Sequence, residues 1–277
     1  GKIRMNFGKT YVLGALAAFT IASGAAAQDC PTDLETVSKG QLTVAVTTFA
    51  PYSFMNEKNE LSGVDGDIVK AAAKRLCLEV ETLVVDPAAA IQSVMAGRAD
   101  LTVGDWYRTA ERAAVMSFTT PLYLDSMGII STTGTDTVED LVGQTVGTVQ
   151  GYLWVQDLEK LLGDDLQLYS SSVNLQQDLR SGRIKNAVDG AATAQLAVER
   201  GDLEGYQVSI AAPDDRIAAS MQPAQVGFPM RKNAVNLLAA LDVVLEDMKA
   251  EGMIVELLSS YGLSPEMADV GEPRLVE

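Results

Sequence analysis

Short apolar runs alternate along the chain with longer amphipathic segments. The runs at 41–46, 79–85 and 101–103 are rich in aliphatic and β-branched residues, which is typical of buried strands. The segments that begin at Asp67 and Ala88 repeat apolar residues at helical spacing, and Asp67 is expected to cap its helix. Strands that alternate with helices of this size predict parallel βαβ units in an open α/β sheet.

One helix–glycine–strand connection occurs twice. Gly97 ends a predicted helix ahead of the strand at 101–103, and Gly182 ends another ahead of a strand at 184–188. Glycine at such positions supplies the left-handed cap of a helix. The repeat indicates two α/β units of comparable size, although this connection is common enough to recur by coincidence.

Two strands are expected to connect these units. The run at 129–135 leaves the first unit, and the run at 226–230 returns to it. We therefore expect one lobe from residues 28–132 plus 225–277, and a second lobe from residues 133–224. The cleft between two such lobes should lie at the carboxyl ends of the strands, where open α/β sheets bind ligands.

The first 27 residues have the pattern of a secretory signal peptide. Lys2, Arg4 and Lys9 precede an apolar run at 11–21, and three small residues at 25–27 provide a cleavage site before Gln28. A membrane anchor is the alternative, but the run is short for a bilayer span and is interrupted by polar and small residues. We expect export to the periplasm and removal of residues 1–27.

Charge and composition exclude several classes of function. The 277 residues contain 21 Lys+Arg against 37 Asp+Glu, a net charge of −16 that disfavours nucleic-acid binding. The chain has no histidine, which excludes Ser-His-Asp and Cys-His catalysis and the HExxH zinc motif. Two cysteines are too few for a four-cysteine zinc or iron–sulfur site, so we expect no cofactor and no metal. In an oxidising compartment, Cys30 and Cys77 are expected to form a disulfide; two buried thiols are the alternative.

Several ordered motifs resemble the polar amino-acid solute-binding proteins of ABC importers. The resemblance extends from about residue 41 to residue 262, and its motifs lie at 49–54, 61–67, 109–112, 118–123, 141–151 and 249–252. It implies two lobes joined by two hinge strands that close over an amino-acid ligand, with delivery of this ligand to a membrane permease. A monomer is the default expectation.

Position by position, the resemblance implies how a ligand is held. Arg112 matches the family arginine that binds the α-carboxylate, and a guanidinium suits a carboxylate because it forms two parallel hydrogen bonds. A surface arginine paired with Glu111 or Asp105 is the alternative. Tyr152 and Leu153 follow Gly151 in a turn whose backbone amides face the same carboxylate.

The family aspartate that binds the α-amino group aligns with Gly190. Asp189 lies one residue earlier, and a shift of one residue turns a strand side chain to the other face. Asp189 and Asp105 are both candidates for the amine partner. A solvent-facing loop acid is the alternative for Asp189.

Aromatic residues are concentrated around the predicted cleft. Some are expected to pack the lobes, especially Tyr52 and Trp154; the set is Phe49, Tyr52, Trp106, Tyr107, Tyr152 and Trp154. Aromatic faces attract cations, and Tyr107, Tyr152 and Leu153 replace small polar residues of the family. We therefore expect a cationic or otherwise modified amino acid as ligand. The alternatives are an exported enzyme resembling cyclohexadienyl dehydratase, with Asp105 or Asp189 as general acid, and a sensory module.

Overall fold

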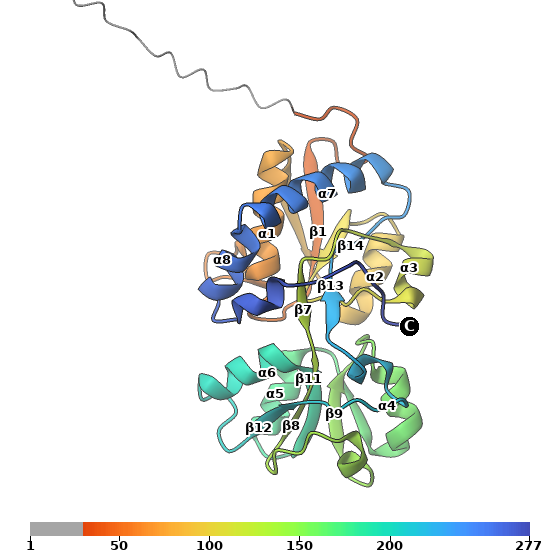
Figure 1. Ribbon diagram of the computed structural model, residues 1–277, viewed down its shortest axis with the longest axis vertical. Helices are drawn as coiled ribbons and strands as arrows, with labels where there is room; N and C mark the ends of the chain where they lie inside the picture. The colour runs from red at the N-terminus through yellow and green to blue at the C-terminus, as the bar shows by residue number, and fades with distance from the viewer. Residues whose placement is uncertain (1–29) are drawn as a thin grey trace, which may run out of the picture.

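The computed structural model describes residues 30–277, which form two α/β lobes placed end to end (Figure 1). The signal segment predicted at 1–27 and its cleavage before Gln28 lie outside the described residues. Each lobe has a five-stranded sheet, with the order β4-β1-β5-β14-β6 in lobe 1 and β10-β9-β11-β8-β12 in lobe 2. In both sheets, three neighbouring parallel strands are followed by one antiparallel strand and an edge strand. The sequence prediction of two α/β lobes with mostly parallel sheets is confirmed.

The strand bounds agree closely with the apolar runs at 41–46, 79–85 and 101–103, whereas the strand predicted at 184–188 lies at 186–190. In lobe 1 the strands are β1 (Gln41–Val46), β4 (Glu79–Val84), β5 (Leu101–Val103), β6 (Ser117–Phe118) and β14 (Pro229–Met230). In lobe 2 they are β8 (Met127–Ser131), β9 (Val146–Val149), β10 (Leu166–Tyr169), β11 (Asn186–Gly190) and β12 (Gln207–Ile210). A small hairpin, β2 (Phe54–Met55) with β3 (Leu61–Ser62), lies in the loop after β1.

Helices cover both faces of each sheet, which explains why central strands such as β1 are apolar along their length. In lobe 1 the helices are α1 (Val64–Arg75), α2 (Pro87–Met95), α3 (Ala110–Val115), α7 (Val235–Ala250) and α8 (Met253–Ser260). In lobe 2 they are α4 (Val155–Leu162), α5 (Ser172–Arg180) and α6 (Ala191–Glu199). Short 3₁₀ turns are η1 (Val138–Leu141), η2 (Gly163–Asp165), η3 (Ala218–Ser220) and η4 (Pro265–Ala268).

The expectation that Asp67 caps the first helix is wrong. Helix α1 begins earlier, at Val64, and its cap is Gly63. Asp67 lies in the first turn, where it accepts a hydrogen bond from the Tyr261 hydroxyl at 2.6 Å and forms an ion pair with Lys70 at 2.8 Å. Its role is therefore to fasten α8 to α1 and to place negative charge near the helix N-terminus.

Two antiparallel strands connect the lobes: β7 (Tyr123–Asp125) and β13 (Ala224–Val226) (Figure 1). The run at 226–230, expected as one returning strand, forms the end of β13 and then β14. The run at 129–135, expected to leave lobe 1, begins within β8, which pairs with β11 and β12 inside the lobe 2 sheet, and residues 132–135 follow this strand. The sequence boundary after residue 132 placed this strand in the wrong lobe, because β7 is too short to stand out as a strand of its own.

The C-terminal segment is bound to the hinge by one buried glutamine. The side-chain amide of Gln225, on β13, donates to the carbonyls of Val270 (2.8 Å) and Glu272 (2.7 Å). Its oxygen accepts from Arg108 Nη1 (3.0 Å) and from the Arg274 amide (2.8 Å). All four hydrogen-bonding positions of this amide are thus used, as burial requires.

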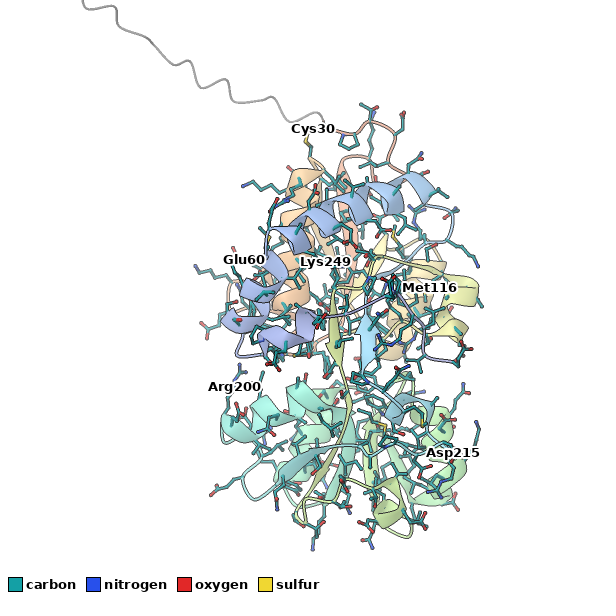
Figure 2. All side chains as sticks on the ribbon, in the orientation of Figure 1. Cys30, Glu60, Met116, Arg200, Asp215 and Lys249 are labelled. Atoms are coloured by element: carbon teal, nitrogen blue, oxygen red, sulfur yellow. A yellow bond between two sulfur atoms is a disulfide. The ribbon has the colours of Figure 1, made fainter. Side chains whose placement is uncertain are left out.

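Cys30 and Cys77 form a disulfide with a Cα–Cα distance of 5.6 Å, as the sequence predicts. Cys77 directly follows the C-terminal end of α1. Figure 2 shows Cys30 at the end of lobe 1 that faces away from lobe 2, so the bridge is remote from the space between the lobes. Among residues 30–277, no helix combines the length and the apolar character needed to span a bilayer.

Candidate ligand-binding site

A cavity lies between the lobes. It is lined by residues that follow the carboxyl ends of β1, β4, β5, β9 and β11, which is where the sequence analysis expects a cleft. The lining residues are Thr47, Phe49, Pro87, Gly104, Asp105, Trp106, Tyr107, Arg112, Tyr152, Leu153, Trp154 and Gly190. The structure therefore brings together all of the candidate site residues except Asp189.

Aromatic rings of the two lobes meet across this cavity. Phe49 of lobe 1 contacts Tyr152 of lobe 2 edge to face, with ring centroids 5.8 Å apart. Tyr107 and Trp154 make a second such contact at 6.0 Å, and the Trp154 indole donates to Thr148 Oγ1 at 2.8 Å. These contacts hold the lobes closed and give the cavity flat, electron-rich walls. Tyr52, by contrast, is fully buried beneath Phe49 and packs the core.

Arg112 stands on α3 at the edge of lobe 1 and reaches lobe 2. The Thr109 hydroxyl caps α3 and accepts from the Arg112 amide at 3.1 Å, which fixes where the side chain begins. The guanidinium donates to the Tyr107 carbonyl at 2.9 Å and to the Gly151 carbonyl at 3.4 Å, and it lies 4.8 Å from the centre of the Trp106 ring. Burial lowers its pKa to about 10, which leaves it fully charged at neutral pH. These bonds use two of its five N–H donors, so the group can also bind an anion.

The turn after β9 faces Arg112 from lobe 2. Gly151 has φ of +90°, a conformation that only glycine adopts without strain, and the chain then enters α4 through Trp154. Tyr152 and Leu153 line the cavity within this turn. The amide of Leu153 has no acceptor among the described residues and lies just before the N-terminus of α4, where the helix dipole favours an anion.

Asp105 is the acidic residue of the lining, and its backbone is held in an unusual conformation. Its φ is +59°, which is rare for a residue other than glycine. The amides of Gly104 and Asp105 both donate to Asp65 Oδ2 at 2.9 Å, and Tyr123 donates to Asp65 Oδ1 at 2.7 Å. Asp65 thus stabilises the strained loop that presents Asp105, as strain at ligand sites generally requires.

Sequence reasoning missed Asp125, the last residue of β7. Its carboxyl group lies beside that of Asp105 and accepts hydrogen bonds from the amides of Ser126 and Ala192. Burial raises the pKa of both carboxyl groups, and the charge of Asp125 raises that of Asp105 further. The sequence does show that Asp125 follows the apolar residues Tyr123 and Leu124. That the strand they form lies behind the cleft, however, is visible only in the fold.

Asp189 lies behind the cavity wall and not in it. Its carboxylate accepts from the Ser172 hydroxyl at 2.7 Å and from the Gly190 amide at 2.9 Å, and it is fully buried. Burial raises its pKa to about 7. Because β11 extends through residue 190, strand alternation still applies, so Gly190 faces the cavity and Asp189 faces α5.

The described residues hold no group of three or more acidic or cysteine side chains arranged for a metal ion. What the cavity offers instead is the Arg112 guanidinium, the free amide of Leu153, the buried carboxyl group of Asp105 and aromatic walls. A closed cleft of this kind between two α/β lobes is typical of proteins that enclose a small molecule.

Comparisons with known proteins specify the family. The chain belongs to family 3 of the bacterial extracellular solute-binding proteins, whose family model matches residues 42–264. It is 28% identical over 232 residues to the histidine-binding periplasmic protein of Escherichia coli (strain K12), covering 77% of this chain and 84% of the relative. It is 24% identical over 227 residues to the lysine/arginine/ornithine-binding periplasmic protein of the same strain, covering 78% and 84%.

Solved structures agree in fold. An ancestral arginine-binding protein bound to arginine has a TM-score of 0.70 and 26% identity, with coverage of 80% of this chain and 98% of the other. The substrate-binding protein AbpA of Streptococcus pneumoniae, bound to L-arginine, has a TM-score of 0.71 and 26% identity, with coverage of 80% and 94%. These similarities establish the two-lobed fold of this family for the chain.

Proposed function

We propose that this protein captures a cationic amino acid in the periplasm and delivers it to the permease of an ABC importer. One observation carries the proposal: the charged Arg112 and the buried Asp105, whose Oδ1 has no hydrogen-bond partner, line one cavity with aromatic walls. A zwitterion with an additional positive charge complements this arrangement. The names of the relatives point the same way, because they bind histidine, or lysine, arginine and ornithine.

In the proposed complex, the ligand carboxylate binds Arg112 from lobe 1 and the amide of Leu153 from lobe 2. The ligand cation lies toward Asp105, beside the aromatic rings of Phe49 and Tyr152. Because the two anchors of the carboxylate belong to different lobes, the ligand stabilises the closed form over the open form. Closure is therefore a shift of population driven by contacts that only the closed form completes.

Thermal unfolding with a panel of amino acids tests this proposal. We expect arginine, lysine, ornithine or histidine to raise Tm, and glutamate to leave it unchanged, since a ligand that binds only the native state stabilises it by RT ln(1 + L/Kd) at a free ligand concentration L. Stabilisation by glutamate or glutamine alone would contradict the cationic ligand.

An enzyme on the same scaffold is the second candidate, because a buried Asp105 that keeps its proton is what a general acid requires. The two functions differ in one measurement. A binding protein returns its ligand chemically unchanged, so mass spectrometry of the ligand recovered after long incubation is expected to show the original mass. Loss of water from a cyclohexadienyl acid would favour the enzyme.

A further inference from the structure

Two carboxyl groups from different parts of the chain converge on one point of the cavity wall. Asp105 comes from the loop after β5 in lobe 1, and Asp125 comes from the hinge strand β7. Gly190 of lobe 2 marks the point: a Cβ atom built there would lie 2.9 Å from Asp125 Oδ2 and 3.5 Å from Asp105 Oδ2. Gly190 and Asp105 both line the cavity, and Asp125 lies directly behind this part of the wall.

Neither carboxyl group has a positive partner. Asp105 is 8% exposed and Asp125 is 5% exposed, and both are outside every ion pair of residues 30–277. Asp105 Oδ1 and Asp125 Oδ2 are buried and accept no hydrogen bond from the protein. Two neighbouring carboxylates that are buried without a cation cannot both ionise, so they keep one proton between them, as carboxyl dyads do.

We propose that Asp105 and Asp125 form a proton-sharing pair that receives the positively charged nitrogen group of the ligand, and that the shared proton is released to solvent when this group binds. The ligand keeps its own charge, and one O–H bond of the pair is exchanged for hydrogen bonds from the ligand N–H groups. This inference rests on the cationic ligand of the proposed function. It adds Asp125 to the site and makes binding dependent on pH.

The other titratable groups around the pair behave differently. Four tyrosine hydroxyls stay neutral because burial raises their pKa values well above the ordinary value: Tyr52, Tyr107, Tyr123 and Tyr152. Arg112 stays charged, with a pKa of about 10. Burial also raises the pKa values of Asp65 and Asp189, to about 6 and about 7. Each of these two carboxyl groups accepts a hydrogen bond from a hydroxyl group, Tyr123 for Asp65 and Ser172 for Asp189.

Calorimetry in several buffers measures the released proton directly. We choose L-arginine and L-lysine as ligands, because neither side chain titrates between pH 5.5 and 8. At pH 6.5, the slope of the observed binding enthalpy against the ionisation enthalpy of the buffer gives the number of protons exchanged. We expect release of close to one proton for the wild-type protein, and tighter binding by up to about tenfold per pH unit as pH rises.

Asp125→Asn is the test variant and Asp189→Asn is the matched control, since both remove a buried acid near Gly190. We expect Asp125→Asn to release almost no proton and to bind at least about tenfold more weakly. Asp189→Asn should keep the release of the wild type. A wild-type slope of zero, or an unchanged slope in Asp125→Asn, overturns the inference while leaving the proposed function intact.

Two outcomes separate the inference from the proposed function. If neither L-arginine nor L-lysine binds and no cationic amino acid raises Tm, the proposed function fails and the inference fails with it. If Asp125→Asn does not fold, the wild-type slope and the pH dependence of wild-type Kd still decide, because each is measured on the native chain.

Discussion

Gly151 of lobe 2 lies directly against Ala88 of lobe 1. A Cβ atom built on Gly151 would come within 3.0 Å of both Cα and N of Ala88, at the first turn of α2. These are backbone atoms, which cannot move aside as a flexible side chain would. Because this contact joins the two lobes, a side chain at residue 151 would clash in the closed form and not in an open one.

We therefore expect Gly151→Ala to weaken ligand binding by about tenfold or more, because the added methyl group destabilises the closed form. Gly143→Ala is the matched control: its φ of +76° imposes a similar backbone cost, but nothing lies within 4 Å of its Cβ position. Calorimetry gives the affinities, and small-angle scattering with saturating ligand reports closure. Equal affinities for the two variants would contradict this role of Gly151.

Arg112→Ala should reduce ligand affinity by about two to three and a half decades, or roughly 3–5 kcal/mol. The reason is that the ligand carboxylate would be buried without its positive partner. Arg112→Lys should recover only part of the loss, since an ammonium cannot bind both carboxylate oxygens in the planar manner of a guanidinium.

Arg180→Ala, on the exposed face of α5, is the control and should bind like the wild type. An Arg112→Ala affinity within about threefold of wild type would show that Arg112 is not the carboxylate anchor.

Removal of the Cys30–Cys77 bridge should lower the free energy of unfolding by about 4 kcal/mol, on the chain-entropy estimate for the loop of 47 residues that it closes. Ligand affinity should not change, because the bridge lies at the far end of lobe 1 (Figure 2). Denaturant unfolding of a Cys30→Ser/Cys77→Ser variant measures the first effect and calorimetry the second. Equal unfolding midpoints for variant and wild type would refute the stabilising role.

The buried carboxyl of Asp189 should make the ligand-free protein less stable as pH rises. Its pKa is about 7 in the folded chain and about 3.9 in an unfolded one. The unfolded state therefore loses its proton first, so the free energy of unfolding falls between about pH 4 and pH 7 and is level above that range.

Asp189→Asn should remove this contribution and stabilise the protein at pH 8 by roughly 2–4 kcal/mol, with Ser172 still able to pair with the amide. Denaturant titrations at several pH values measure the slope. Asp164→Asn, at an exposed position in η2, is the control. A slope that is the same in the wild type and in Asp189→Asn would contradict the assignment.

Local sequence patterns were enough to predict most helices and strands. Features that depend on packing between distant segments could not be predicted from the sequence. Strands β1 and β5 match their apolar runs, because a strand covered by helices on both faces must be apolar along its length. The start of α1 was misplaced because the segment from Gly63 resembles a turn until Tyr261 is packed against it.

The residues of the candidate site also fall into those that the sequence could place and those that it could not. Arg112 follows a visible capping threonine, and the turn at Gly151 follows a visible strand, so both could be placed from the sequence. Asp125 could not, since its importance comes from the position of β7 between the lobes. On β11, a shift of one residue decides whether residue 189 or residue 190 faces the cavity. This register is set by the pairing of β11 with β8, which the sequence alone does not reveal.

The bonds of Gln225 also bear on the order in which the molecule can be completed. Strands β8 to β12 are continuous in the chain, so the lobe 2 sheet needs no residue beyond 210. The lobe 1 sheet needs β14, and the side-chain amide of Gln225 needs the carbonyls of Val270 and Glu272. Lobe 1, which begins first in the chain, is therefore completed last, and the hinge is secured only when residues 270–272 are in place.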